Sequence, residues 1–356
     1  MRLIVDDPHF ISMVHNLQRC GITKVIVTTS ACQRRSDQLL NTEEFNFMFG
    51  RKATVYDILH HEKGKHIQRD ICDKMATLTD VLAQSLCSID IFSLHTKDSM
   101  WKNLRPKSMS NLMELTIQEF PHDYGFIESM PKLIKLKTSQ NQVNKQLIEQ
   151  IGKSCPALQE LDLSLPSKDM ENTINDDCAE GIKMYMSRLK KLSVSSTGLT
   201  NVGVYHISRL EHLEKLCLCG CHRITHDVIK ILGEGDCNNL SVLDISDIRG
   251  IEDPNEALIL MDEDKLHLLE LAIQGKVNDN GIKSLIRTDI KTLKLLGPFE
   301  ITARGASLLA KLKLERLIVD KYHLGETKEM IGLIKKTCTA VEIVYIYHHT
   351  LLDQLN

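Results

Sequence analysis

The densest group of side chains that could carry out chemistry consists of Cys217, Cys219, Cys221 and His222, with His226 close behind. Thiolates and imidazoles are ligands of zinc, which needs four of them converging as a tetrahedron. Side chains alternate along a strand, so Cys217 and Cys219 would share one face, while Cys221 lies beyond the strand and His226 belongs to a first helical turn. No Cys-x-x-Cys pair reinforces the group. We therefore interpret these residues as structural, with a zinc site and a redox site as the two alternatives.

Two further patterns resemble motifs of catalysis or ligand binding. Gly152-Lys153-Ser154 matches the end of a phosphate-binding loop, but Leu147 stands where the upstream glycine should be, and the segment would end a helix instead of starting one. The histidines at 60–61, 66, 95 and 348–349 lack a spaced set of partners, so we interpret them as surface or loop residues. We therefore expect no catalytic residue, no metal, no cofactor and no enzymatic activity.

The composition narrows the class of protein. The 356 residues carry a formal net charge of −3, which favours neither a nucleic acid nor a membrane surface as partner. No stretch reaches the roughly 18 apolar residues of a membrane span, and the apolar start of the chain is too short for a signal peptide. The 11 cysteines are odd in number, so we expect reduced thiols in an intracellular protein, cytoplasmic or nuclear.

A six-residue unit, apolar-x-x-apolar-x-apolar, recurs along most of the chain. Clear copies begin at residues 158, 189, 213, 240, 268, 290, 314 and 341, and looser copies begin at 86, 112 and 133. Successive copies start 21 to 31 residues apart, about 25 on average, which is close to the roughly 20–29 residues of leucine-rich repeats. Each unit predicts a short strand whose apolar residues face inward, as Leu213, Leu216 and Leu218 would.

A second periodic signal lies between the predicted strands. After most strands comes an apolar residue, then Thr or Asn, then a helical pattern. A Thr or Asn side chain can accept a backbone N–H at the start of a helix, which stabilises it by about 1 kcal/mol. The predicted helix caps are Asn144, Asn175, Thr200, Thr225, Asn278 and Thr302, together with Asp253 followed by Pro254.

Two periodic signals in phase predict an α/β fold, the leucine-rich-repeat solenoid or horseshoe. Parallel strands would form a concave sheet, with short helices on the convex side, and stacking of repeats would supply the core. We expect about eleven repeats over residues 86–356. An N-terminal cap or divergent region would occupy residues 1–85, with a helix at 7–20, a strand at 22–27 and an irregular segment at 29–65.

Several repeats resemble the cysteine-containing repeats of F-box/leucine-rich-repeat proteins. The matching residues are Cys221, Ile224 and Thr225 after one strand, and Cys155, Pro156 and Leu158 before another. His226 replaces the aspartate of the family pattern. The resemblance covers roughly residues 86–346 and implies a substrate receptor of a cullin-type ubiquitin ligase. We find no F-box segment in residues 1–85.

Residues between the inward positions of each strand would point onto the concave sheet and form a protein-binding face. The predicted face consists of Lys135, Lys137, Glu160, Asp162, Lys191, Lys215, Asp244, Glu270, Lys294, Arg316, Ile318, Tyr345 and Tyr347. Charge alternates between repeats, which argues against a nucleic-acid backbone as the ligand and also fits a solvated sheet with cross-strand ion pairs. The C-terminal members would add an exposed apolar and aromatic patch typical of an interaction hot spot.

These patterns predict a protein-binding scaffold, a substrate receptor or adaptor of a ubiquitin ligase. The alternative is a stand-alone inhibitor-like or regulatory leucine-rich-repeat protein with no ligase link. In both hypotheses a protein partner binds the concave face, and the first adds ubiquitin-ligase components. Residues 1–85 distinguish them, because a recruiting module there would support the first and a simple cap the second.

Overall fold

The fold is given by a computed structural model that describes residues 2–4, 11, 24–28, 88–91, 109–117, 127–128, 130–138, 143–164, 173–261, 265–298, 300–320, 332–336 and 342–346. The chain forms two compact units. Unit 1 comprises Met1–Gln140 and Lys145–Pro166, and unit 2 comprises Asn141–Asn144 and Ser167–Asn356.

Unit 1 contains parallel strands, each paired with the next one along the chain. Its elements are β1 (Arg2–Ile4), β2 (Lys24–Thr28), β3 (Ser88–Ile91), β4 (Glu114–Ile117), β5 (Lys135–Thr138), α7 (Lys145–Ser154) and β6 (Glu160–Asp162). The strand predicted at 22–27 is β2, whereas most of the helix predicted at 7–20 and all of the irregular segment at 29–65 lie outside the described residues. The role of residues 1–85 as a cap stays a prediction.

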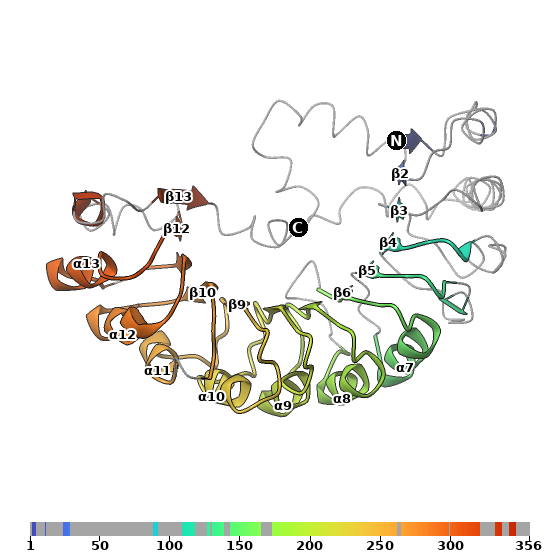
Figure 1. The fold of residues 1–356 in the computed structure, drawn as a ribbon, viewed down its shortest axis with the longest axis horizontal. Coiled ribbons are helices and arrows are strands. Elements are labelled where there is room, and N and C mark those ends of the chain that lie inside the picture. Colours follow the sequence, from blue (N-terminus) through green and yellow to red (C-terminus); the bar gives the residue numbers. More distant parts are fainter. Residues whose placement is uncertain are drawn as a thin grey trace, which may run out of the picture. The chain divides into compact units, whose positions relative to one another are not determined.

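Unit 2 repeats a strand followed by a short helix, and each of its paired strands again lies parallel to the next. Its strands are β7 (Lys191–Ser193), β8 (Lys215–Cys217), β9 (Val242–Ile245), β10 (Glu270–Gln274), β11 (Thr292–Leu296), β12 (Arg316–Asp320) and β13 (Glu342–Ile346). Its helices are α8 (Asp176–Tyr185), α9 (Asn201–Ile207), α10 (Val228–Gly233), α11 (Pro254–Ile259), α12 (Asp279–Ser284) with η3 (Leu285–Arg287), and α13 (Ala303–Leu309). Within unit 2 these helices lie on one side of the strands (Figure 1).

A column of leucines forms the core between the strands and helices of unit 2. One leucine from each strand stands in register with the leucine of the next, and each is at most 1% exposed. The column consists of Leu192, Leu216, Leu243, Leu271, Leu293 and Leu317. The inward positions predicted for Leu213, Leu216 and Leu218 are confirmed, because all three are buried. The parallel strand order, one short helix after each strand and this aliphatic column define an α/β leucine-rich-repeat solenoid.

Most of the predicted caps start helices as expected. The side chains of Asn175, Thr200, Asp253, Asn278 and Thr302 each accept a backbone N–H from the first turn of the following helix. Pro254 occupies the first helical position after Asp253, where its missing N–H has no cost. Asn144 directly precedes α7.

A second contact at the caps links neighbouring repeats. The first residue of α8, Asp176, accepts hydrogen bonds from Thr200 N at 2.9 Å, Thr200 Oγ1 at 2.7 Å and Gly203 N at 2.9 Å. Asp279 in α12 accepts in the same way from Thr302 N at 2.8 Å and Thr302 Oγ1. Each acidic side chain therefore holds the start of the next helix, and we call this series of contacts the cap ladder.

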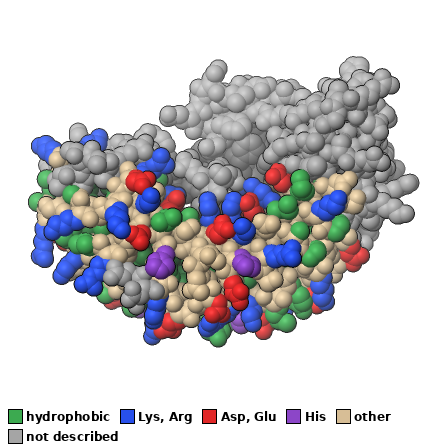
Figure 2. All heavy atoms as spheres, in the orientation of Figure 1, with side chains coloured by type: hydrophobic (Ala, Val, Ile, Leu, Met, Phe, Trp, Pro, Cys, Tyr) green, Lys and Arg blue, Asp and Glu red, His purple; other side chains and the backbone are tan. Residues whose placement is uncertain are grey.

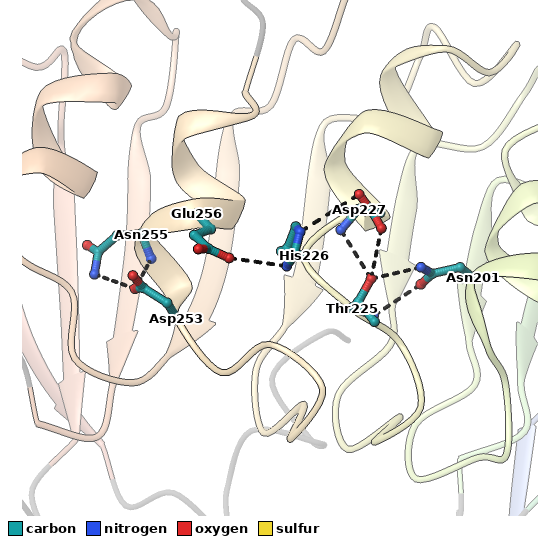
Figure 3. A network of polar contacts seen from close by, with 7 residues as sticks. All are labelled: Asn201, Thr225, His226, Asp227, Asp253, Asn255 and Glu256. Atoms are coloured by element: carbon teal, nitrogen blue, oxygen red, sulfur yellow. Dashed lines mark hydrogen bonds and ion pairs between the residues drawn. The ribbon is translucent and has the colours of Figure 1, made fainter.

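The cap ladder changes between α10 and α11 (Figure 3). Asn201 still holds Thr225, accepting from its N–H at 3.1 Å and donating to its Oγ1 at 2.8 Å. The next position is His226, whose ring instead faces Glu256 at 3.4 Å and Asp227 at 3.9 Å. As predicted, Thr225 Oγ1 accepts a backbone N–H, from Asp227 at 3.4 Å, but α10 begins only at Val228, so the prediction that His226 lies in its first turn is wrong. The Thr225 hydroxyl is already engaged by Asn201 and donates to the Asp227 carboxylate at 3.2 Å.

Candidate protein-binding surface

The sheet of unit 2 has one face covered by helices and one face turned away from them, which we call the open face. Two rows of side chains cross the open face from β7 to β12, and strand register aligns the members of each row. The first row is Lys191, Lys215, Val242, Glu270, Thr292 and Arg316. The second row is Ser193, Cys217, Asp244, Ala272, Lys294 and Ile318. Neighbouring members are separated by about 4.8 Å, the spacing of strands in a sheet.

The first row is the accessible one. Arg316 is exposed, and the other five members are half-buried. Two lysines, Lys191 and Lys215, lie side by side at one end, and Glu270 lies three strands from Lys191. Val242 and Thr292 complete the row, and the alternation of side chains along each strand places them there. The row therefore offers cationic, apolar, anionic and hydroxyl groups to a partner at fixed intervals.

The second row is largely buried, because its members pack on one another. The Ser195 hydroxyl lies 3.0 Å from Cys217 Sγ, and the Asp244 carboxylate accepts from Ser246 N at 2.9 Å and from Ser246 Oγ at 2.5 Å. Lys294 reaches across the row to Glu270 at 2.5 Å. Only Ser193 among the six is more than slightly exposed.

This packing corrects the expected exposure of three predicted surface residues. Asp244, Lys294 and Ile318 were expected on a solvent-facing surface, but they are 4%, 5% and 5% exposed. Each lies between two neighbouring strands of the sheet. Asp244 accepts hydrogen bonds from Ser246, and Lys294 forms an ion pair with Glu270. A partner would meet the first row before it reached these side chains.

Asp244 is the buried carboxylate of the open face. Burial raises the pKa of Asp244 above its ordinary value, while the hydrogen bonds from Ser246 and the positive charge of Lys294 act in the opposite direction. Since the carboxylate is hydrogen-bonded to Ser246, directly after its own strand, it has the properties of an internal structural group.

The predicted residues of unit 1 form cross-strand ion pairs on β5 and β6. Lys135 lies 3.6 Å from Glu160, and Lys137 lies 3.2 Å from Asp162. The four side chains are about one quarter to one third exposed, so solvent screens both pairs. These contacts confirm that opposite charges pair between neighbouring strands, which the alternation of charge along the repeats indicated.

The cysteine cluster is structural in its geometry. Cys221 is fully buried, and its thiol donates to Val194 O at 3.2 Å and lies 3.2 Å from Thr197 Oγ1. Burial raises the pKa of both Cys217 and Cys219, so both thiols stay protonated and poorly nucleophilic. Across the described ranges, no three His, Cys, Asp or Glu side chains are grouped so that they could hold a metal ion.

The structure describes only part of the C-terminal end of the predicted face. Ile343 and Tyr345 belong to β13, which pairs with β12, but their side chains lie outside the described residues, as does Tyr347. Their contribution to a binding surface stays a prediction. In the part of the chain that the structure describes, no helix has the length and apolar character needed to span a bilayer.

Comparisons with known proteins find distant resemblances. No protein-family model and no curated protein matches the chain. Among solved structures, the chain is similar to a chain of the yeast Rad7–Elc1 complex, with 12% identity and a TM-score of 0.45 over 89% of this chain and 94% of that one. It is similar to the leucine-rich-repeat-containing protein LegL7 from Legionella pneumophila, with 10% identity and a TM-score of 0.45 over 95% and 97%. A third likeness is to the TLR13–ssRNA13 complex, with 17% identity and a TM-score of 0.47 over 79% and 38%.

Proposed function

We propose that this chain is a protein-binding scaffold whose partner contacts the first row of the open face of unit 2. The observation that carries the proposal is the row itself, six accessible side chains of different chemistry held in register on consecutive parallel strands. A rigid sheet presents such a row without loss of backbone entropy on binding, which favours selective recognition. The buried second row supports this role because it fixes the positions of the side chains beside it.

The more specific proposal is that the scaffold is a substrate receptor or adaptor of a ubiquitin ligase. It rests on the resemblance of the cysteine-containing repeats to those of F-box/leucine-rich-repeat proteins. The burial of Cys155 and Cys221 at the matching positions is consistent with that resemblance. A stand-alone regulatory protein with the same binding row is the alternative, and it would recruit no ligase component.

Affinity purification of the tagged full chain, followed by mass spectrometry, tests both levels. We expect a specific protein partner whose recovery falls about tenfold when the first row is altered by Lys215→Glu or by Thr292→Arg. The matched control is Lys230→Glu, because Lys230 is an exposed lysine on α10, away from the open face. A partner retained equally by all variants would contradict the open-face proposal. A cullin-linked adaptor in the purified set would support the ligase role, and its absence beside a row-dependent partner would favour the stand-alone alternative.

A further inference from the structure

Charge is distributed unevenly along unit 2. Residues 211–270 contain five Lys or Arg and fourteen Asp or Glu, whereas residues 276–316 contain nine Lys or Arg and four Asp or Glu. The nearly neutral total of the whole chain hides this change of sign between neighbouring repeats. In the space-filling view, Lys and Arg side chains gather over the end of unit 2 that contains α12 and α13 (Figure 2).

Every acidic side chain in residues 276–316 is already engaged within the unit. Three of the four form ion pairs with lysines between neighbouring repeats, and the fourth, Asp279, holds the start of α13 through Thr302. The ion pairs are Asp289 with Lys313 at 2.6 Å, Glu300 with Lys276 at 3.2 Å, and Glu315 with Lys291 at 2.9 Å. Lys294 is also neutralised, by Glu270.

Five cations lie outside these pairs. Arg316 belongs to the first row of the open face, and the other four are Lys283, Arg287, Arg304 and Lys311. All four are exposed, and none forms an ion pair with a described residue. We call them the helix-side basic surface, because they stand on α12, on η3, at the start of α13 and directly after α13. They belong to the helical side of the unit, not to the open face.

The repeat geometry brings these cations together. Lys283 and Arg287 are four residues apart along the consecutive turns of α12 and η3, and both are exposed. Arg287 and Lys311 are 24 residues apart, the same separation as the registered leucines Leu293 and Leu317 of β11 and β12, so they occupy the same position in adjacent repeats. Like charges at such spacings repel, and an anionic partner would relieve that repulsion.

The side chains between the cations identify the kind of anion. Ile286 stands next to Arg287, and Leu308 stands between Arg304 and Lys311; both are half-buried. Neither α12, η3 nor α13 contains an aromatic residue on which a base could stack. Carboxylates interspersed with apolar side chains complement this surface better than a sugar-phosphate backbone does.

We propose that the helix-side basic surface is a second interaction site, which binds an acidic segment of a protein partner carrying Asp or Glu next to apolar residues. This inference does not depend on the open face, because the two surfaces lie on opposite sides of the sheet. Binding of one partner segment to each side would allow the unit to hold two partners, or two parts of one.

The probe for this site is a short fluorescent peptide of alternating Glu and Leu, titrated with the full-length protein and followed by anisotropy. We expect saturable binding that weakens about tenfold when Arg287→Glu and Lys311→Glu are combined, because two exposed attractive pairs become repulsive. Binding should also weaken as salt is raised from about 0.05 to 0.2 M. Lys230→Glu on α10 reverses one charge elsewhere, half the charge change of the double variant, and should change the affinity little. The open-face variant Lys215→Glu should bind the peptide as the parent does, so failure of the open-face proposal and failure of this one are distinguishable.

Three results would overturn the proposal. The first is no saturable peptide binding at low salt by protein whose circular dichroism matches the parent. The second is an equal loss for Lys230→Glu and for the double variant, which would mean attraction to net charge and not to a site. The third is tighter binding of a single-stranded oligonucleotide that the same double variant abolishes, which would assign the surface to nucleic acid.

Discussion

The junction between α12 and α13 and the junction between α10 and α11 use equivalent positions with different residues. At the first, Asp279 follows the cap Asn278 and accepts two hydrogen bonds from Thr302. At the second, His226 follows Thr225, and its ring makes only long contacts with Asp227 and Glu256. In Figure 3 the dashed lines from His226 lead to Asp227 and Glu256, and none leads to the next cap, Asp253.

Repeat length accounts for part of the difference. The caps Asn278 and Thr302 are 24 residues apart, whereas Thr225 and Asp253 are 28 apart. Glycine accounts for another part. The backbone N–H of Gly203 donates to Asp176, and a Cβ added at Gly281 or at Gly305 would lie 2.4 Å from Asn255 Oδ1 or 2.1 Å from Asp279 Oδ1 of the preceding repeat. In the repeat that follows His226, Glu256 stands three residues after the cap Asp253, where Gly203, Gly281 and Gly305 stand in their repeats. The interlock therefore depends on the residue after the cap of one repeat, and a glycine three residues after the next cap leaves room for that side chain.

The strongest way to break the intact junction is Gly305→Ala. The added Cβ would lie 2.1 Å from Asp279 Oδ1 and 2.5 Å from Ile301 Cγ2, so the carboxylate that holds Thr302 must move. We expect the free energy of unfolding to fall by about 3 kcal/mol, as for overpacking combined with a lost hydrogen bond. Urea unfolding measures it. Gly332→Ala is the control, since nothing lies within 4 Å of its Cβ position, and equal losses for both variants would contradict the steric argument.

Removal of the carboxylate itself should have the next largest effect. Asp279→Ala leaves Thr302 N and Oγ1 without their acceptor and is expected to cost about 2 kcal/mol in the same unfolding experiment. Asp279→Asn keeps one acceptor oxygen and should recover part of that loss. No difference between the Ala and Asn variants would mean that the cap ladder contributes little to stability.

The two threonine caps offer a direct comparison. Thr200 caps α9 by accepting from Val202 N at 3.1 Å, so Thr200→Ala should destabilise the unit by about 1 kcal/mol. Thr225 accepts from Asp227 N at the longer distance of 3.4 Å, ahead of the start of α10, so Thr225→Ala should cost less than Thr200→Ala. Thermal unfolding followed by circular dichroism ranks the two variants, and the reverse order would show that the contact of Thr225 with Asn201 matters more than a cap.

The smallest effect is expected at the interrupted junction. The His226 side chain is 40% exposed, and its acidic neighbours are more exposed still. His226→Ala should therefore change the unfolding free energy by less than about 0.5 kcal/mol near neutral pH. A loss as large as that of Asp279→Ala would mean that the junction between α10 and α11 is held by the histidine after all.

Periodic residues made the architecture predictable from the sequence. The six-residue apolar unit repeated about every 25 residues predicted the strands, and buried Leu192, Leu216 and Leu243 occupy its positions. The caps at Thr200, Asn278 and Thr302 were predictable for the same reason, because capping needs only a hydroxyl or amide directly before a helix.

The candidate surface was less predictable. Alternation along a strand shows which side of the sheet a residue takes, and it placed Lys215, Asp244 and Lys294 together on the open face. It does not show how far a side chain is covered by its neighbours on adjacent strands. Lys294 is buried because Glu270 lies diagonally across from it, and that relation depends on strand register.

By itself the sequence determined the fold class, the strand positions and most helix starts, since each depends on residues within a single repeat. Only the tertiary structure decided which acidic groups form ion pairs inside the unit and which of the described cations lie outside those pairs. Asp289, Glu300 and Glu315 lie 24 residues from their lysine partners, so the spacing of repeats joins them. The physical reason is that an ion pair or a buried carboxylate is set by distance in space, whereas strand and helix propensities are set by neighbours along the chain.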